Sequence, residues 1–453
     1  QSLAKRIWKE DLDNLLDTIQ KEICPSLTGD VREYIQTDEF RQRIALLVWE
    51  QLIGERAAPE LRICPGTLSD IERDSLLGDR PVVLIAFESF PNVTNECFPL
   101  MIDSLVYNLE NLSSLRWQVG LAHVSWLNAQ CRPNRIILYD SVSHRLIEAN
   151  LEPPPLVQAI LVLCASPQTH RKTSFLASDN EILELNPYMR TAEWADSKIV
   201  SYDLWQEHSV PTPRSALILQ GSTPEEIASR LQRFCSSSQE PIGESMFYSF
   251  QPNSGTEGHG VDKWVLRIGE EANWSSIANR VKLLADEDDV LIREVVGNVR
   301  FHPPESVNGR SCDLRINVSF DGEAYRAESG YLQVAGDEDE WVSSTSRGGL
   351  ICKFSRGALA KLRGPGGAPV SIDLKTVEHL SDVAISAAKA FPGLGLVGVD
   401  LKLEVTSRGR LRAHVLDANP RPAGLTHSEF LPGGTGAVEP GVTRHLWRRI
   451  SSV

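Results

Sequence analysis

The chain has 453 residues, enough for about three domains of ordinary size, and its apolar and charged fractions are those of a globular protein. Its formal net charge of −14 argues against binding to nucleic acid or to a membrane surface, since both need basic patches. No apolar run reaches the roughly 20 residues of a membrane-spanning helix, and the eight scattered cysteines form no Cys-x-x-Cys pair, so we expect a cytoplasmic protein without a zinc or redox motif.

Residues 1–80 are predicted to be an amino-terminal helical segment. Apolar residues recur at helical spacing between Ile7 and Ile19, and the same spacing returns between Phe40 and Leu52. No catalytic pattern is visible in this part of the sequence. We therefore expect these helices to pack against the rest of the chain or to support a homodimer.

Residues 81–197 follow a different pattern, in which short buried-strand runs alternate with helical stretches. The runs are Val82–Phe87, Ile136–Tyr139 and Ala159–Leu163. Such alternation predicts an open, largely parallel α/β sheet. Sheets of this kind bind ligands beyond the carboxyl ends of their strands, although no residue here identifies a ligand.

Residues 198–292 are predicted to form a second unit, with a glycine-rich loop between two strands. The strands lie near residues 246–250 and 264–268, and the loop is Gln251–Gly260. Its glycines allow backbone N–H groups to approach an anion closely. The strand–loop–strand order matches neither a Walker A loop nor a Rossmann fingerprint. For an isolated loop of this kind, a mobile hairpin tip is the commoner explanation.

Residues 293–453 are predicted to form a further sheet unit that ends in a hairpin. An amphipathic helix is expected from about residue 375 to 390 and stops at Phe391-Pro392-Gly393. Strand Gly398–Val405 then leads through a tight-turn signal, Ser407–Arg410, into a second strand.

The hairpin carries three oxygen-bearing side chains that suit a metal. If Arg408-Gly409 is the centre of a symmetric turn, Asp400 lies opposite Asp417, and Asn419 shares a face with Asp417. Like charges directly opposite each other destabilise a sheet, and Mg²⁺ bound between them would remove that penalty. Two solvated acids on an exposed sheet face explain the pattern equally well, and a turn of odd length would shift the register.

Taken in order, the segments from Lys198 to the carboxyl terminus resemble the ATP-grasp superfamily. The resemblance implies an α/β (α+β) ATP-grasp fold, preceded by an open α/β domain and the amino-terminal helical segment. It also implies roles for individual residues. The glycine-rich loop is expected to be a lid over the phosphates, and residues 294–296 are expected to be a hinge that holds adenine and ribose. The residues expected to bind ATP are Lys198, Gln251, Gly255, Thr256, Gly258, Glu294 and Val296.

The same resemblance implies a metal site and two catalytic arginines. The expected Mg²⁺ ligands are Asp400, Asp417 and Asn419. Arg315, in Asp-Leu-Arg, is similar to the Asp-x-Arg strand of the amino-acid-adding members. Arg421, in Asn-Pro-Arg, is similar to the arginine of the carboxylase-like members and is expected to face an acyl phosphate or the acceptor.

Two positions depart from the family pattern. Gln251 occupies the end of a strand where the family usually has a lysine, so one positive charge expected near the phosphates is missing. Lys263 or Arg267 on the next strand can substitute for it, or the glutamine can donate a hydrogen bond. The second departure is Asp417, where many members have a glutamate. Aspartate remains a competent Mg²⁺ ligand.

The resemblance implies an ATP-dependent carboxylate–amine ligase, with ATP and Mg²⁺ as cofactors and a small-molecule carboxylate and amine, such as amino acids or a peptide, as substrates. Two alternatives stay open. One is an ATP-grasp kinase that phosphorylates a small molecule without forming an amide. The other is a nucleotide-binding module that has lost catalysis, which the glutamine at position 251 would suit.

Overall fold

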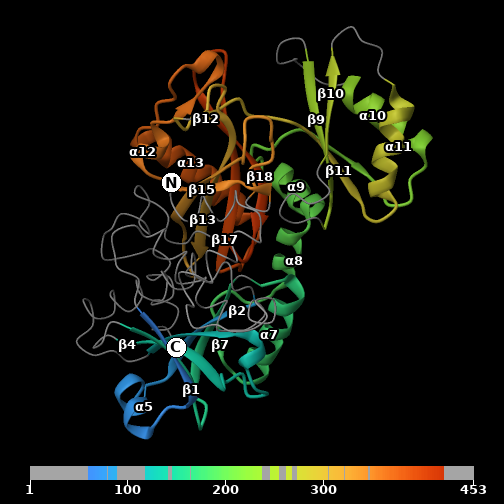
Figure 1. Ribbon diagram of the computed structural model, residues 1–453. Helices are drawn as coiled ribbons and strands as arrows, with labels where there is room; N and C mark the ends of the chain where they lie inside the picture. The colour runs from blue at the N-terminus through green and yellow to red at the C-terminus, as the bar shows by residue number, and fades with distance from the viewer. Residues whose placement is uncertain are drawn as a thin grey trace, which may run out of the picture.

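Three β-sheets organise the computed structural model of this chain (Figure 1). The residues that it describes are 60–78, 80–88, 118–140, 145–163, 165–236, 245–254, 262–267, 273–304, 306–320, 322–344 and 347–422. The helices predicted between residues 1 and about 56 lie outside these ranges, and so do Gly255, Thr256 and Gly258 of the glycine-rich loop.

The first sheet is open and mainly parallel, as predicted. In spatial order its seven strands are β1 (Glu60–Thr67), β5 (Arg145–Asn150), β4 (Arg135–Asp140), β3 (Gln118–His123), β2 (Val82–Phe87), β6 (Val157–Leu163) and β7 (Leu183–Glu184). All neighbours run parallel except the β3–β4 and β4–β5 pairs. Strand β2 is buried along its whole length, which explains why its sequence is a continuous apolar run rather than an alternating one.

Short helices accompany the first sheet. They are α5 (Asp70–Leu76), the 3₁₀ turn η1 (Val124–Trp126) and α7 (Pro167–Asp179). Helix α5 begins with a capping box, in which the Ser69 hydroxyl accepts from the Glu72 amide and the Glu72 carboxylate accepts from the Ser69 amide. Helix α7 is capped by the Ser166 hydroxyl and starts with a proline.

The first sheet also includes residues before the predicted boundary at 81. Strand β1 pairs in parallel with β5, and Leu68, Leu76 and Leu77 are buried in the core of the first sheet. Residues 60–80 therefore belong to the sheet unit rather than to the predicted helical segment. The helical spacing of apolar residues ends before strand β1. Only the pairing of β1 with the distant strand β5 shows that it belongs to the first sheet.

Two consecutive helices, α8 (Arg190–Asp196) and α9 (Lys198–Glu207), connect the first sheet to the rest of the molecule (Figure 1). Tyr202 and Trp205 of α9 are buried in the same core as the carboxyl-terminal sheet. The Trp205 indole Nε1 donates to the Ala387 carbonyl at 3.1 Å. Helix α9 therefore packs with the carboxyl-terminal sheet, although the sequence placed it in the unit of residues 198–292.

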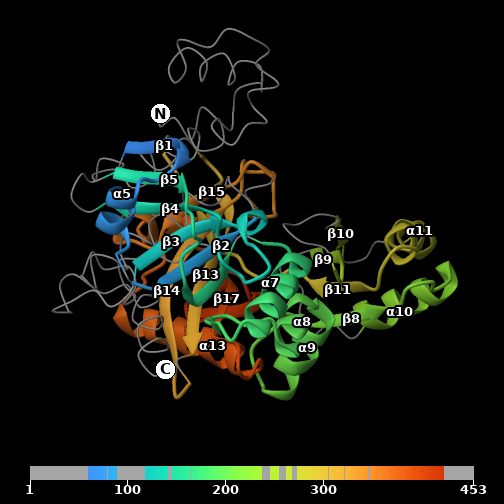
Figure 2. The same cartoon turned by 90° about the horizontal axis from the view of Figure 1, so that it is seen from below.

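The small sheet has four antiparallel strands with two helices. Its spatial order is β10 (Asp262–Arg267), β9 (Ser245–Pro252), β11 (Val290–Glu294) and β8 (Ser215–Ile218), and its helices are α10 (Pro224–Ser236) and α11 (Trp274–Ala285). Ile227 and Leu231 of α10 share a core with Ile277 and Val281 of α11. Seen from below, this unit projects sideways from the body of the molecule (Figure 2).

The carboxyl-terminal sheet is also antiparallel. Its strands are β12 (Arg300–Phe301), β13 (Arg310–Phe320), β14 (Tyr325–Val334), β15 (Leu350–Lys353), β16 (Leu362–Arg363), β17 (Leu396–Val405) and β18 (Leu411–Asn419). One path runs β15-β14-β13-β12-β16, and β13 also pairs with β17, which pairs with β18. Short α12 (Arg356–Leu359), the 3₁₀ turn η3 (Pro365–Gly367) and the long helix α13 (Leu374–Lys389) complete this unit.

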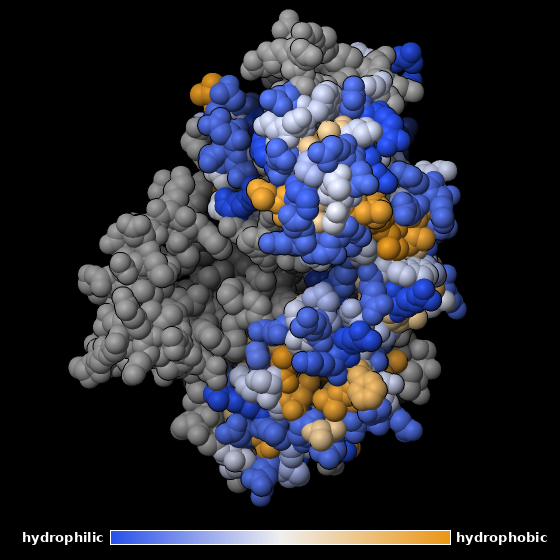
Figure 3. Space-filling view, turned by 90° about the vertical axis from the view of Figure 1, so that its right-hand side faces the viewer, coloured by the Kyte–Doolittle hydropathy of each residue, from blue (hydrophilic) through white to orange (hydrophobic). Residues whose placement is uncertain are grey.

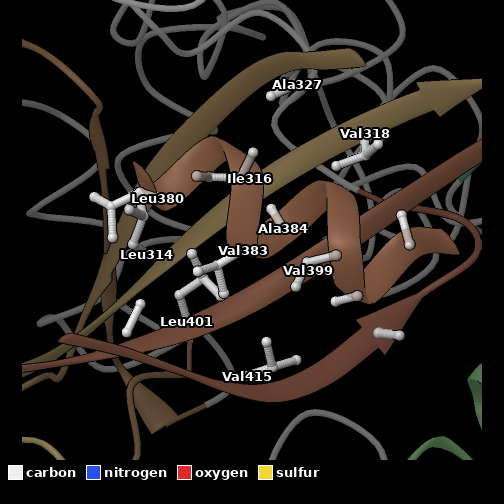
Figure 4. Packing of buried hydrophobic residues seen from close by; sticks show 14 of the residues in the cluster. Leu314, Ile316, Val318, Ala327, Leu380, Val383, Ala384, Val399, Leu401 and Val415 are labelled. Carbon is white, nitrogen blue, oxygen red and sulfur yellow. The ribbon is translucent and has the colours of Figure 1, made fainter. Parts of the chain in front are cut away.

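Helix α13 covers one face of the carboxyl-terminal sheet with the apolar stripe that the sequence predicted. The Asp373 carboxylate caps its first turn. Its inward side chains meet those of β13, β17 and β18 (Figure 4), and the buried members of the stripe are Val377, Leu380, Val383, Ala384 and Ala387. This core holds β17 and β18, and therefore the predicted metal ligands, in a fixed place.

The α/β class and the order of an open sheet, a small sheet and a carboxyl-terminal sheet agree with the predicted fold. Among the residues that the structure describes, no helix is both long and apolar enough to cross a membrane.

Candidate functional site

The hairpin of β17 and β18 places Asp400 directly opposite Asp417, as predicted, but by another route. Near the turn, Val405 pairs with Leu411, so the turn has an odd length. A β-bulge then adds Leu416 between the Leu401–Val415 pair and the Asp400–Asp417 pair. The bulge restores the register that the odd turn had shifted, and Asp400 and Asp417 face each other.

Arg315 holds Asp400 from the neighbouring strand. It lies opposite Asp400 in the β13–β17 register. Its Nε and Nη2 donate to the two carboxylate oxygens of Asp400 at 2.6 and 2.7 Å, which is a bidentate pair with a fixed geometry. The predicted catalytic arginine is therefore next to the predicted metal ligands. Asp313, two residues earlier, pairs with Lys402 of β17 at 2.6 Å.

Asp417 is a partly buried acid surrounded by charged side chains. Burial raises its pKa above the usual range, the nearby Lys198 ammonium lowers it, and the carboxylate of Asp400 raises it again. Lys198 is the first residue of α9, and only 5 % of its surface is exposed. The predicted phosphate lysine and the predicted metal ligand thus lie together, although they come from segments more than two hundred residues apart.

Asn419 completes the predicted set. Its Nδ2 donates to Asp400 Oδ2 at 3.4 Å, so all three predicted metal ligands occupy one corner of the sheet. We call the group of Lys198, Arg293, Arg315, Asp400, Asp417 and Asn419 the opposed-acid site.

The oxygen donors of the opposed-acid site suit a hard cation that takes its remaining ligands from a phosphate. Within the described part of the chain, no group of three or more histidine, cysteine, aspartate or glutamate side chains could hold a metal ion by itself. Two carboxylates and an amide oxygen are nevertheless a suitable partial shell, because Mg²⁺ usually keeps several waters and takes further oxygens from substrate phosphates. An ion bound between Asp400 and Asp417 would reduce the repulsion between their like charges.

Gln251 lies at the end of β9 and is 7 % exposed. Its Oε1 accepts a hydrogen bond from Arg293 Nη2 of β11 at 2.5 Å. Sequence reasoning looked for a compensating cation at Lys263 or Arg267, on the following strand, and missed Arg293. In the observed register Gln251 pairs with Leu291, so Arg293, two residues further along, is on the same face.

Glu294 and Val296 occupy the segment that leads from the small sheet into the carboxyl-terminal sheet, where a hinge was predicted. The Glu294 carboxylate accepts from Arg214, whose Nη2 and Nε lie 2.9 and 3.1 Å from Glu294 Oε1. Arg214 also covers the ring of Phe234 at 4.4 Å and donates to its carbonyl. The hinge acid is therefore held by an arginine that the sequence did not single out.

Arg421 contacts helix α8 and the start of helix α7. Its Nη2 donates to Asp196 Oδ1 at 2.5 Å, its Nε to the Ala165 carbonyl at 3.1 Å, and its Nη1 lies 3.4 Å from His170 Nδ1. We call these four residues the Arg421 junction. It ties the end of β18 to α8 and to the start of α7, so this arginine joins two units of the fold.

Burial controls protonation in the Arg421 junction. The pKa of His170 falls to about 3 because the ring is buried and lies beside the Arg421 guanidinium. Its Nε2 donates to the Asn186 carbonyl at 2.7 Å, which leaves Nδ1 as the acceptor for Arg421. The pKa of Asp196 is raised by burial, against the opposing effect of Arg421.

The carboxyl end of the first sheet carries a further acid, Glu88. Its carboxylate accepts from the Ser166 amide at 2.7 Å and from the Thr169 hydroxyl at 2.6 Å, at the start of α7. The residues that follow Glu88 up to Asn95 lie outside the described residues. Glu88 thus has a clear role in fixing α7.

No protein-family model matches the sequence, and no curated protein matches it. Solved structures are similar at low identity. D-cycloserine synthetase DcsG matches with a TM-score of 0.46 and 14 % identity, over 82 % of this chain and 99 % of that one. The VanG D-Ala:D-Ser ligase from Enterococcus faecalis gives 0.47 and 12 %, over 82 % and 99 %. The D-alanyl-alanine synthetase A of Vibrio cholerae gives 0.46 and 13 %, over 83 % and 98 %. Likeness at this level does not define an activity.

Proposed function

We propose that this protein is an ATP-dependent carboxylate–amine ligase that releases ADP and phosphate. The observation that carries the proposal is the opposed-acid site. Two acids face each other across a hairpin, and cationic side chains from α9, β11 and β13 surround them. Such a mixture of hard oxygen donors and cations suits a nucleotide triphosphate with its metal ion.

In this proposal the residues have separate tasks. Asp400, Asp417 and Asn419 would hold Mg²⁺, which when bound neutralises phosphate charge. Lys198 binds a phosphate group, and Glu294 and Val296 contact ribose and adenine. Gln251 borders the phosphates, and the loop with Gly255, Thr256 and Gly258 covers them and excludes water.

The proposed reaction has two steps. A substrate carboxylate oxygen attacks the γ-phosphorus, the bond to the β-phosphate oxygen breaks, and an acyl phosphate and ADP result. An amine then attacks the acyl carbon, loses a proton, and displaces inorganic phosphate to leave an amide. Arg315 stabilises developing negative charge, an effect of about 2–4 kcal/mol for a well-aimed donor. The bonds of Arg421 to Asp196 and Ala165 favour a positioning role for it.

We propose amino acids or a small peptide as substrates, a cytoplasmic location, and no nucleic-acid or membrane partner. We also propose a homodimer that uses the amino-terminal segment, whose predicted helices lie outside the described residues. On the face shown in Figure 3 the surface is mainly hydrophilic and its apolar residues form separate patches. The large exposed apolar side chains are also dispersed over different units, as with Phe175 on α7, Leu283 on α11 and Leu374 on α13.

The test is to incubate the protein with Mg²⁺-ATP and amino acids, singly and in pairs, and to follow ADP, phosphate and product masses. A product equal in mass to two substrates minus water, formed in step with ADP, supports the ligase. ADP with one phosphorylated substrate would instead indicate a kinase.

A silent nucleotide-binding module is the second candidate, and one observation favours it. Arg315 already engages both carboxylate oxygens of Asp400, so this acid is partly satisfied without a metal ion. A protein that binds ATP but releases no ADP with any pair would support this candidate.

A further inference from the structure

Arg293 lies where three parts of the molecule meet. It belongs to β11 of the small sheet, and its Nη2 donates to Gln251 of β9 in the same sheet. Its Nη1 donates to the Tyr202 hydroxyl of α9 at 3.0 Å and to the Leu416 carbonyl of β18 at 3.2 Å. Leu416 is the bulge residue that immediately precedes Asp417. The guanidinium is therefore fixed beside the opposed acids by one bond from each of three elements.

These bonds orient the guanidinium without neutralising it. Each acceptor that binds Arg293 is uncharged: an amide oxygen, a hydroxyl and a carbonyl. They occupy three of the five N–H donors that an arginine carries. Arg214, Arg315 and Arg421, by contrast, each bond to a carboxylate. A fixed and charged guanidinium held by neutral acceptors is prepared for an anion.

The guanidinium of Arg293 lies beside the opposed acids, because it bonds the carbonyl of Leu416, the residue directly before Asp417. We infer that Arg293 binds a phosphate group of the nucleotide and supplies the cation that Gln251 cannot. Gln251 is then a positioning residue, whose amide oxygen holds the guanidinium in place. This inference rests on the proposed function, since it requires ATP in the opposed-acid site.

The test compares binding of ATP with binding of adenosine, which has no phosphate, by isothermal titration calorimetry without any turnover. Arg293→Gln should weaken ATP binding by about 10- to 100-fold, as expected for loss of a charge-assisted hydrogen bond. Adenosine binding should change by less than about twofold, because the lost interaction is with phosphate.

The second part of the test moves the positive charge from one strand to its neighbour. Adding Gln251→Lys to Arg293→Gln returns a cation to the neighbouring strand, and most of the lost ATP affinity should return. Arg230→Gln is the matched control, since this arginine of α10 also donates to a neutral acceptor, the Leu217 carbonyl, and has no part in the proposed site. ATP binding by this variant should stay within about threefold of that of the unaltered protein.

The contrary outcomes are distinct. If Arg293→Gln binds ATP normally, or loses ATP and adenosine affinity equally without rescue by Gln251→Lys, then Arg293 only joins the sheets and the inference is overturned. If the unaltered protein binds ATP but forms no product, the proposed ligase fails while the Arg293 result still decides the inference. If the unaltered protein binds no ATP, both are overturned.

Discussion

Two clusters of charged residues lie at the end of β18, the opposed-acid site and the Arg421 junction, and they differ in kind. In the Arg421 junction, the guanidinium meets the Asp196 carboxylate, the Ala165 carbonyl and a neutral His170. In the opposed-acid site, Asp400 and Asp417 face each other and Arg293 is held by uncharged acceptors. The two clusters are four residues apart along the chain, from Asp417 to Arg421.

The difference separates structural from functional use of charge. A buried ion pair with complementary partners fixes the position of two units, and removing one partner leaves a buried charge unpaired. Two acids placed opposite each other cost stability as they stand. The opposed-acid site also gathers three cations around these acids, more than a structural ion pair needs, and this is the reason to look for function at Asp417 rather than at Arg421.

The largest effect is expected from Asp417→Asn. Turnover of Mg²⁺-ATP should fall by about 10²- to 10³-fold, because one oxygen ligand and its charge are lost. The free energy of unfolding should stay constant or rise by about 1 kcal/mol, since a buried carboxylate beside a like charge is removed. ADP release and urea denaturation measure the two quantities.

Glu404→Gln is the matched control for that variant. Glu404 lies on the same hairpin, nearer the turn, and pairs with His414 at 2.9 Å. Its loss should leave turnover unchanged. Normal turnover in the Asp417 variant would contradict the proposal that Asp417 is a metal ligand.

The next largest effect is expected from Arg421→Met, and it should appear in stability. The change leaves the Asp196 carboxylate buried without its cation, which should cost about 3 kcal/mol of unfolding free energy. The double variant with Asp196→Asn should recover a large part of this loss. ATP binding measured by calorimetry should be retained, and a selective loss of ATP binding with normal stability would reverse the comparison between the two clusters.

A smaller effect concerns pH. The pKa of His170 is about 3 in the folded protein, well below the value near 6.5 of a solvated histidine. The unfolded chain therefore binds the extra proton first as pH falls below about 6.5. Stability contributed by neutral His170 is complete above that pH and is lost toward pH 3, with a slope of up to about 1.4 kcal/mol per pH unit.

His170→Gln isolates this contribution, because a glutamine can donate to the Asn186 carbonyl and accept from Arg421. Urea denaturation at pH 7 and pH 5 should show a smaller difference between the two pH values in the variant than in the unaltered protein. An equal difference would show that other groups cause the acid sensitivity.

The smallest effect is expected from Gln251→Lys alone. The new ammonium would lie beside Arg293, so the protein without nucleotide should lose about 1 kcal/mol of stability through like-charge repulsion. ATP would relieve that repulsion, and the rise in melting temperature on adding ATP should exceed that of the unaltered protein. A smaller rise would place Gln251 away from the phosphates.

The sequence was sufficient where the deciding signal is local. The stripe on α13 and the opposition of Asp400 and Asp417 were predicted from spacing within one helix and one hairpin. Even there, the odd turn and the compensating bulge at Leu416 were not visible, because a bulge depends on the pairing of the whole strand.

The sequence was insufficient where the deciding contact joins distant segments. Arg293 meets Gln251 only because β9 and β11 pair in a particular register. Arg421 meets Asp196, 225 positions earlier, through the packing of α8 against β18. The partners of β1 and α9 were not predicted for the same reason, since both elements find them far along the chain.

Helix α9 has a consequence for how the chain is made. It is synthesised before the small sheet, but its partner Ala387 follows Trp205 by 182 residues. At cellular rates of elongation, that delay lasts roughly 10–40 s. During this time the Trp205 indole lacks its Ala387 partner and much of the core that α13 completes. Translation that stops before α13 would leave this side of α9 incompletely covered.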